Sequence, residues 1–134
     1  MFVDASAIVA ILATEPDAPL FVAELERGNG RTSPMAVWES VVSLSRRLNV
    51  DPHFASELVS DLLAGAPVDI VAVPPEAADL AVEAFVRFGK GRHPAGLNFG
   101  DCFSYACARH LRVPLLYKGR DFPSTDIASA LPAD

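Results

Sequence analysis

The sequence predicts a single α/β domain in which a mostly parallel sheet is flanked by helices on both faces. Short apolar segments with strand character alternate along the chain with longer segments of helical periodicity. The chain has 134 residues, of which 51% are hydrophobic and 21% charged. That length and composition suffice for one hydrophobic core and exclude a disordered chain. We therefore predict one domain over residues 1–134.

The N-terminal third is predicted to contain a strand followed by two helices. Residues 1–3 read as a short buried strand that ends at a carboxylate, Asp4. An apolar helix follows over residues 5–12. Residues 18–27 form an amphipathic helix, which the glycines of residues 28–30 end.

The middle of the chain is predicted to contain a short strand at residues 31–33 and then two helices. Ser33 and Pro34 are a favourable N-cap and first residue for a helix to Leu48. Apolar residues three or four apart mark its predicted core face: Val37, Val41, Leu44 and Leu48. Asp51-Pro52 caps the next helix, to about Ala64, with this apolar stripe: Phe54, Leu58, Leu62 and Leu63.

The second half begins with a predicted strand at residues 68–73, which Pro74-Pro75 ends before another helix. The large apolar residues of that helix, and one alanine, are predicted to face inward: Ala78, Val82, Phe85 and Val86. Residues 89–100 form a long glycine-rich basic loop of the kind that is often functional. His93 in this loop has no His or Cys partner at metal-ligand spacing and is predicted to be an exposed loop residue.

The last third centres on a helix after Gly100 that is apolar or small on nearly every side, which predicts a buried position. Asp101 lies in its first turn. Residues 113–117 are predicted to form a further strand that leads to Asp121, and residues 125–131 a short edge strand.

Four carboxylates are predicted to meet at one edge of this sheet. Asp4 and Asp121 follow predicted strands, while Glu39 and Asp101 lie in early helical turns. In a parallel α/β sheet these places lie at the carboxyl end of the strands. Asp4 and Asp101 could instead be plain helix caps, and Glu39 a solvated helix residue.

Converging carboxylates repel one another, by about 4 kcal/mol for two charges about 4 Å apart at an effective dielectric constant of 20. Such a cluster persists with raised pKa values or with a bound cation. Oxygen ligands without nearby His or Cys favour Mg²⁺ or Mn²⁺ over zinc. Such ions activate water and clamp a phosphodiester, which points to a nuclease.

The net charge of −6 argues against a general polyanion binder, so a nucleic-acid substrate would need a cation or a local basic patch. No apolar run is long enough to span a membrane. No secretory signal is visible, and Cys102 and Cys107 lie five residues apart on different sides of one helix. We therefore expect reduced thiols and a cytoplasmic protein without a membrane partner.

Several motifs resemble the PIN-domain ribonucleases, and more closely the VapC toxins of type II toxin–antitoxin pairs. The resemblance covers the whole chain. It rests on these stretches: residues 1–7 (MFVDASA), Glu39, residues 98–102 (NFGDC) and residues 118–127 (KGRDFPSTDI).

This resemblance implies a single PIN-like domain over residues 1–134, with a metal-dependent endoribonuclease activity toward structured RNA such as tRNA or rRNA. Asp4, Glu39, Asp101 and Asp121 would be the catalytic acids that hold Mg²⁺ or Mn²⁺. Ser6 would match a hydroxyl that hydrogen-bonds within the site. The resemblance also implies a homodimer and a cognate VapB antitoxin that blocks the site, often with a basic side chain.

Five polar or basic residues are candidate substrate contacts. Asn98 matches a polar position of the family motif, and the basic candidates are ordinary surface charges in the alternative interpretation: Arg120, Lys118, Lys90 and Arg92. Asp126 also fits the family pattern, but we interpret it as structural.

Three other functions are weighed against the nuclease. A receiver-like module requires an aspartate at the end of a central strand, whereas the strand at residues 68–73 ends at Pro74-Pro75. A haloacid-dehalogenase-type phosphatase requires an Asp-x-Asp motif, and Asp4-Ala5-Ser6 lacks the second acid. A silent PIN-like protein that only binds an antitoxin is disfavoured by the intact set of four acids.

Overall fold

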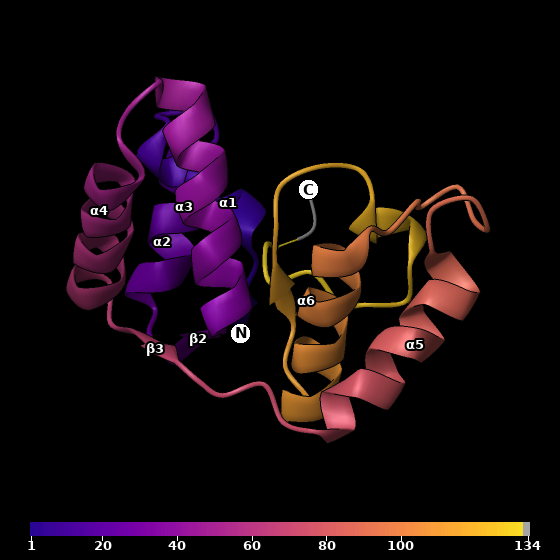
Figure 1. Ribbon diagram of the computed structural model, residues 1–134. Helices are drawn as coiled ribbons and strands as arrows, with labels where there is room; N and C mark the ends of the chain where they lie inside the picture. Colours follow the sequence, from indigo (N-terminus) through magenta and orange to yellow (C-terminus); the bar gives the residue numbers. More distant parts are fainter. Residues whose placement is uncertain (133–134) are drawn as a thin grey trace.

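The computed structural model describes residues 1–132 and shows a four-stranded parallel sheet with helices on both faces (Figure 1). The strand order is β3-β2-β1-β4. The predicted α/β class with a parallel sheet is confirmed. The strands are β1 (Phe2–Val3), β2 (Gly30–Thr32), β3 (Val68–Ile70) and β4 (Leu115–Leu116).

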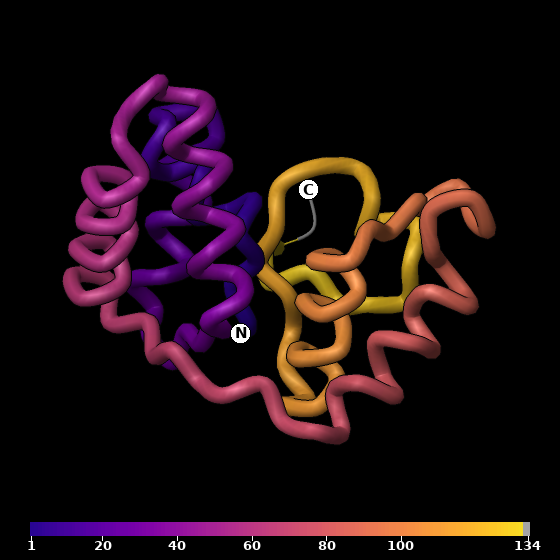
Figure 2. The backbone as a smooth tube through the Cα atoms, viewed as in Figure 1, coloured from indigo at the N-terminus to yellow at the C-terminus, as the bar shows by residue number. Residues whose placement is uncertain are grey.

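The helices divide into two groups, one on each side of the sheet (Figure 1). The first group comprises α1 (Ala5–Leu12), α2 (Ala18–Glu26), α3 (Pro34–Leu48) and α4 (Pro52–Gly65). The second comprises α5 (Glu76–Phe88) and α6 (Phe99–Leu111), and a short 3₁₀ helix, η1 (Phe122–Ser124), follows β4. Figure 2 shows the chain after β3 running as an extended link from the first group to the second.

Each face of the sheet has its own hydrophobic core, because successive residues of a strand point to opposite faces. In β1, Phe2 packs into the core under α5 and α6, and Val3 packs into the core under α1–α4. In β4, Leu115 and Leu116 divide in the same way. A strand of two residues therefore contributes one side chain to each of the two cores.

The strand predicted at residues 68–73 is shorter in the structure, where β3 ends at Ile70. It lies at the edge of the sheet, and Asp69 and Ile70 are exposed. The Val71 N–H still donates a hydrogen bond to the Thr32 carbonyl at 2.8 Å, but Thr32 is the last residue of β2, so residues 72 and 73 extend past the end of the neighbouring strand. The predicted edge strand at residues 125–131 is reduced to one bridge between Leu115 and Ser129.

The predicted inward face of α5 is wrong. All four residues assigned to it, Ala78, Val82, Phe85 and Val86, are exposed, and the buried residues of this helix are Ala77, Ala81, Ala84 and Phe88. Small side chains allow α5 to approach α6 closely, so residue size was a misleading guide to burial here. In the same way Leu48 and Phe54 are exposed, although both were assigned to core stripes.

The helix expected after Gly100 begins at Phe99 and is buried along most of its length. Its two cysteines are buried free thiols, and burial raises the pKa of both. His93 is partly covered rather than exposed, because its ring packs edge-on against Phe88 and its Nδ1 accepts a hydrogen bond from the Ala95 N–H. In the part of the chain that the structure describes, no helix has the length and apolar character that a membrane crossing requires.

Candidate active site

Asp4 follows β1 and caps the N-terminus of α1, as the alternative interpretation from the sequence expected. Its Oδ2 accepts hydrogen bonds from the Ser6 hydroxyl and from the Ser6 backbone N–H, the latter at 3.0 Å. Its Oδ1 accepts a hydrogen bond from the Ser104 hydroxyl of α6. The side chain is 6% exposed. Both oxygens are therefore held in place by helices from opposite sides of the sheet.

Asp101 also serves as part of a helix cap. The Asn98 side-chain oxygen accepts a hydrogen bond from the Asp101 N–H at 2.9 Å, and Asp101 Oδ2 accepts one from the Asn98 N–H at 3.1 Å. This capping box fixes the first turn of α6 and the direction of the carboxylate. Asp101 can therefore cap α6 and also belong to a site that it shares with the other acids.

Glu39 extends from the second turn of α3 toward the start of α6. A Cβ atom at Gly100 would lie within 2.5 Å of the Glu39 Cδ and would overlap both carboxylate oxygens. The missing side chain of Gly100 therefore creates the space that Glu39 occupies. This gives a structural reason for a glycine directly before Asp101.

The four acids are coupled electrostatically. Burial, with the charges of Asp4 and Asp101, raises the pKa of Glu39 to about 7. Burial is also the main cause that raises the pKa of Asp101 to about 6; the hydrogen bond from Asn98 opposes it, and the charges of Asp4 and Asp121 add to it. Asp121 is exposed and precedes η1, so it acts on the cluster from the solvent side.

A cavity of about 340 Å³ brings three of these acids together. Asp4, Glu39 and Asp101 line it together with Ser6. Four further polar or charged residues complete the polar lining: Glu15, Ser43, Arg47 and Lys118. Asp121 is not among the lining residues, so the structure places three of the four predicted acids in one cavity and the fourth near enough for its charge to raise the pKa of Asp101.

The donor set suits a hard divalent cation, because the acids offer oxygen atoms and no soft ligand. The raised pKa values of Glu39 and Asp101 also show that added negative charge is costly here, which a cation would offset. Within residues 1–132, no three His, Cys, Asp or Glu side chains are already gathered in a geometry that could hold a metal ion. Metal binding at this cavity would therefore require the carboxylates to draw together.

The predicted basic contacts lie in different places. The Lys118 N–H donates a hydrogen bond to the Ser6 hydroxyl at 3.0 Å, and its ammonium forms ion pairs with Glu15 and with Asp17 at 3.0 Å. Arg120 is exposed in the loop between Lys118 and Asp121. The structure therefore places Lys118 in the acidic cavity and leaves Arg120 open to solvent.

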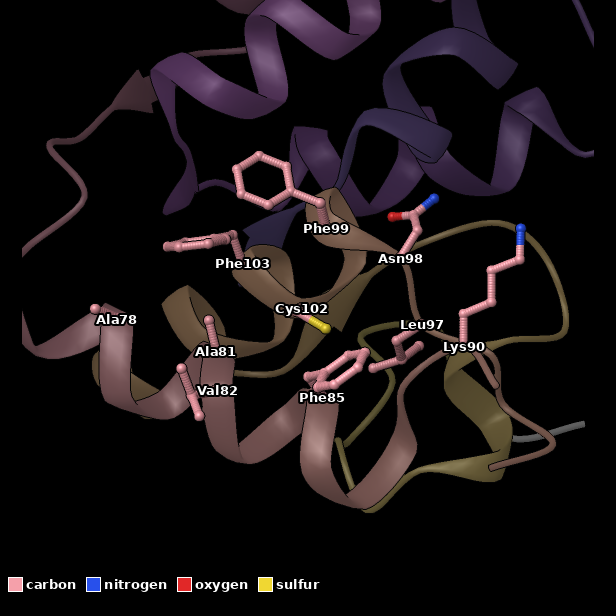
Figure 3. Close-up of a pocket in the computed structure, with 10 residues that line it drawn as sticks. All are labelled: Ala78, Ala81, Val82, Phe85, Lys90, Leu97, Asn98, Phe99, Cys102 and Phe103. Atoms are coloured by element: carbon pink, nitrogen blue, oxygen red, sulfur yellow. The ribbon is translucent and has the colours of Figure 1, made fainter. Parts of the chain in front are cut away.

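Lys90 and Asn98 line a second hollow, an apolar groove of about 590 Å³ between α5 and α6 (Figure 3). Phe99 and Phe103 lie toward one end of the groove, and Lys90 and Asn98 lie at the other. The guanidinium of Arg92 stacks over Phe85 at 5.6 Å and donates a hydrogen bond to the Val86 carbonyl. Lys90 and Arg92 are thus outside the lining of the acidic cavity.

Asp126 has the structural role expected of it. Its carboxylate accepts a hydrogen bond from the Tyr105 hydroxyl at 2.6 Å and pairs with Arg109 at 2.7 Å and Arg87 at 3.1 Å. These contacts attach the C-terminal segment to α5 and α6.

Sequence reasoning missed Ser104 and the Glu15–Arg47 pair. Ser104 lies three residues after Asp101, so helical periodicity alone places both on one face of α6. Arg47 lies in the last turn of α3, where a basic residue is favoured by the helix dipole alone, but its side chain pairs with Glu15. The 32 residues between the two partners leave no local signal for that pair.

Comparison with known proteins agrees with this architecture. The model of the PIN domain family matches residues 1–128. Ribonuclease VapC30 of Mycobacterium tuberculosis is 45% identical, over 98% of this chain and all of the relative. Ribonuclease VapC of Mycolicibacterium smegmatis is 42% identical, over 96% of this chain and 98% of the relative.

The chain belongs to the VapC family of PIN-domain ribonucleases. The predicted family is thereby confirmed. The crystal structure of M. tuberculosis VapC20, described as a Sarcin-Ricin loop cleaving toxin, has a TM-score of 0.73 to this chain and covers 98% of both chains. At 20% identity this likeness confirms the fold. The sequence similarity to VapC ribonucleases supports a function of this chain as a ribonuclease toxin.

Proposed function

We propose that this VapC-family chain is an endoribonuclease toxin that uses Mg²⁺ or Mn²⁺ to hydrolyse phosphodiester bonds. The observation that carries the proposal is the cavity where Asp4, Glu39 and Asp101 meet, with Asp121 acting on Asp101 from outside. Clustered carboxylates with raised pKa values in a cleft are typical of catalytic sites.

Asp4, Glu39, Asp101 and Asp121 would hold the ion. When bound, the ion would supply a water of lowered pKa and a positive charge for the phosphodiester. The hydroxyls of Ser6 and Ser104 keep both oxygens of Asp4 oriented. The capping box does the same for Asp101. In the metal-free protein, Glu39 has a pKa of about 7 and takes up or releases a proton near neutral pH.

The proposed substrate is structured RNA such as tRNA or rRNA. Support comes from the kinship with VapC ribonucleases, and Arg120, Lys118, Lys90, Arg92 and Asn98 remain the candidate contacts. We also propose a cognate VapB antitoxin, a homodimeric assembly and a cytoplasmic location. An antitoxin could insert a basic side chain among the acids, where the charge of the cavity favours it.

Cleavage of total RNA by the purified protein tests this function, with Mg²⁺, Mn²⁺ or EDTA and with Asp101→Asn alongside. We expect discrete fragments from the wild type with metal and none with EDTA or from the variant. Equal cutting by both proteins would reveal a contaminating nuclease. Absence of cutting after removal of any copurifying protein would favour a silent antitoxin-binding module instead.

A further inference from the structure

Three charged residues in the acidic cavity have no part in the proposed metal chemistry. Glu15 lies in the turn after α1, Arg47 in the last turn of α3, and Lys118 two residues after β4. Glu15 connects the two cations, because one carboxylate oxygen pairs with Arg47 and the other with Lys118. Three distant parts of the chain thus place two cations beside the catalytic acids.

The cations of this cluster are open to solvent and their shared carboxylate is covered. The side chains of Arg47 and Lys118 are 48% and 36% exposed, against 14% for Glu15. The two cations hold the pKa of Glu15 below its usual range. A ligand that enters the cavity therefore meets two positive groups whose binding geometry Glu15 already defines.

Binding of a phosphodiester in this acidic cavity requires positively charged side chains. Asp4, Glu39 and Asp101 repel a phosphate, and Arg47 and Lys118 are the cationic residues that line this cavity. An arginine guanidinium matches the oxygens of a phosphate with two parallel hydrogen bonds, and a lysine adds a point charge. The two carboxylate oxygens of Glu15 contact the two cations as two phosphate oxygens would.

We propose that Arg47 and Lys118 form a phosphate-binding site for the RNA backbone beside the catalytic acids, and that the carboxylate of Glu15 occupies this site until RNA displaces it. The inference rests on the proposed nuclease function and adds Arg47 and Glu15 to it. Glu15 acts as an internal competitor, so its charge lowers the affinity for RNA while it keeps both cations in position.

Two substitutions separate this role from a purely structural ion pair, because they move RNA affinity in opposite directions. Arg47→Ala removes a phosphate contact, so RNA binding should weaken three- to tenfold, and the slope of log affinity against log salt should fall by about one. Glu15→Gln removes the charge that competes for both cations and leaves Lys118 paired with Asp17 alone, so RNA binding should tighten severalfold. A structural ion pair would lower the melting temperature in both variants and leave RNA affinity unchanged.

The measurement is fluorescence anisotropy of a labelled mixed-sequence RNA dodecamer at several salt concentrations, with all variants in an Asp101→Asn background to prevent cleavage. Arg46→Ala is the matched control, because Arg46 is the exposed neighbour on α3 and does not line the cavity. Melting temperatures of the same proteins report on folding.

Opposite shifts for Arg47→Ala and Glu15→Gln, with Arg46→Ala unchanged, would establish the phosphate site. Equal losses for Arg47→Ala and Arg46→Ala, or weaker binding by Glu15→Gln in a folded protein, would overturn it while cleavage by the wild type leaves the nuclease intact. Absence of both RNA binding and cleavage in the wild type would overturn the nuclease and the phosphate site together.

Discussion

The acidic cavity and the apolar groove share one wall, the start of α6, yet they differ in size and in chemistry. The groove is the larger, at about 590 Å³ against 340 Å³, but its lining is mostly apolar (Figure 3). The cavity holds carboxylates whose raised pKa values record burial and mutual repulsion. The candidate active site is therefore identified by charged groups that are held close together at a cost in stability. The volume of a hollow does not identify it.

The division between the two hollows follows the periodicity of one helix. Asp101 and Ser104 contact the acidic side, while Phe99, Cys102 and Phe103 line the groove. Asn98 belongs to both, because it lines the groove and caps the turn that carries Asp101. A substitution can therefore alter one hollow and spare the other.

The largest effect should come from Asp101→Asn, which removes one charge from the acidic cavity. We expect RNA cleavage to fall at least about a hundredfold, because an amide is a poor substitute for a carboxylate toward a cation. The melting temperature in EDTA should stay equal or rise, because repulsion with Asp4 and Glu39 is relieved. Glu83→Gln, on the exposed side of α5, is the matched control and should change neither value. Loss of folding in parallel with loss of cleavage would contradict the site assignment.

The next effect should come from Gly100→Ala, which adds one methyl group to the wall between the two hollows. The methyl overlaps the Glu39 carboxylate, so Glu39 must leave its position and cleavage should fall about tenfold or more. Stability should be kept, because alanine favours a helix and the displaced atoms end a flexible side chain.

Gly65→Ala is the control for that substitution, because a Cβ atom at this exposed helical glycine has nothing within 4 Å. A crystal structure of Gly100→Ala would show where Glu39 goes. An unmoved Glu39 with full activity would refute the positioning role of this glycine.

A smaller effect should appear in the pH dependence of stability. An acid whose pKa is raised on folding binds protons more tightly in the folded state, so stability falls as pH rises from the unfolded to the folded pKa. For Glu39 and Asp101 this window runs from about pH 4 to pH 7. Glu15 and Asp126 have lowered pKa values and act in the opposite direction, but only below this window.

We therefore expect the metal-free protein to lose about 1 to 2 kcal/mol of unfolding free energy between pH 5 and pH 8, after allowance for solvent screening at these partly exposed groups. Chemical denaturation in EDTA measures it. The double variant Glu39→Gln/Asp101→Asn should give a flatter profile, and Mn²⁺ should restore stability to the wild type at pH 8. A wild-type profile that rises over this range would contradict the coupling of the acids.

The smallest effect should come from the groove. Val82 is 62% exposed, so Val82→Ser should change the unfolding free energy by less than about 0.5 kcal/mol. Calorimetry should find Mn²⁺ affinity unchanged, because Val82 lines the groove and is not among the residues that line the acidic cavity. A lowered Mn²⁺ affinity would show that the groove and the cavity are coupled through α6.

Prediction from the sequence succeeded for features that depend on interactions between residues close together in the chain. A two-residue apolar strand followed by Asp4, and a buried helix with Asp101 in its first turn, follow from hydrophobic pattern and capping rules. The face of α5 could not be read in this way, because close packing on α6 favours the small residues Ala77, Ala81 and Ala84 over larger apolar ones.

The ion pairs of the acidic cavity could not be predicted from the sequence, for a different reason. The Glu15 pairs with Arg47 and Lys118 exist because the chain returns to the same place after 32 and about 100 residues. No spacing rule connects residues so far apart. The room that Gly100 leaves for Glu39 likewise depends on how α3 and α6 approach each other.

The hydrogen bond from Ser104 to Asp4 spans 100 residues, and β4 pairs with β1 from an even later part of the chain. During synthesis on the ribosome, Asp4 emerges first and waits for both partners. The nascent chain therefore cannot complete the contacts that hold Asp4 and β1 until almost the whole polypeptide has left the exit tunnel.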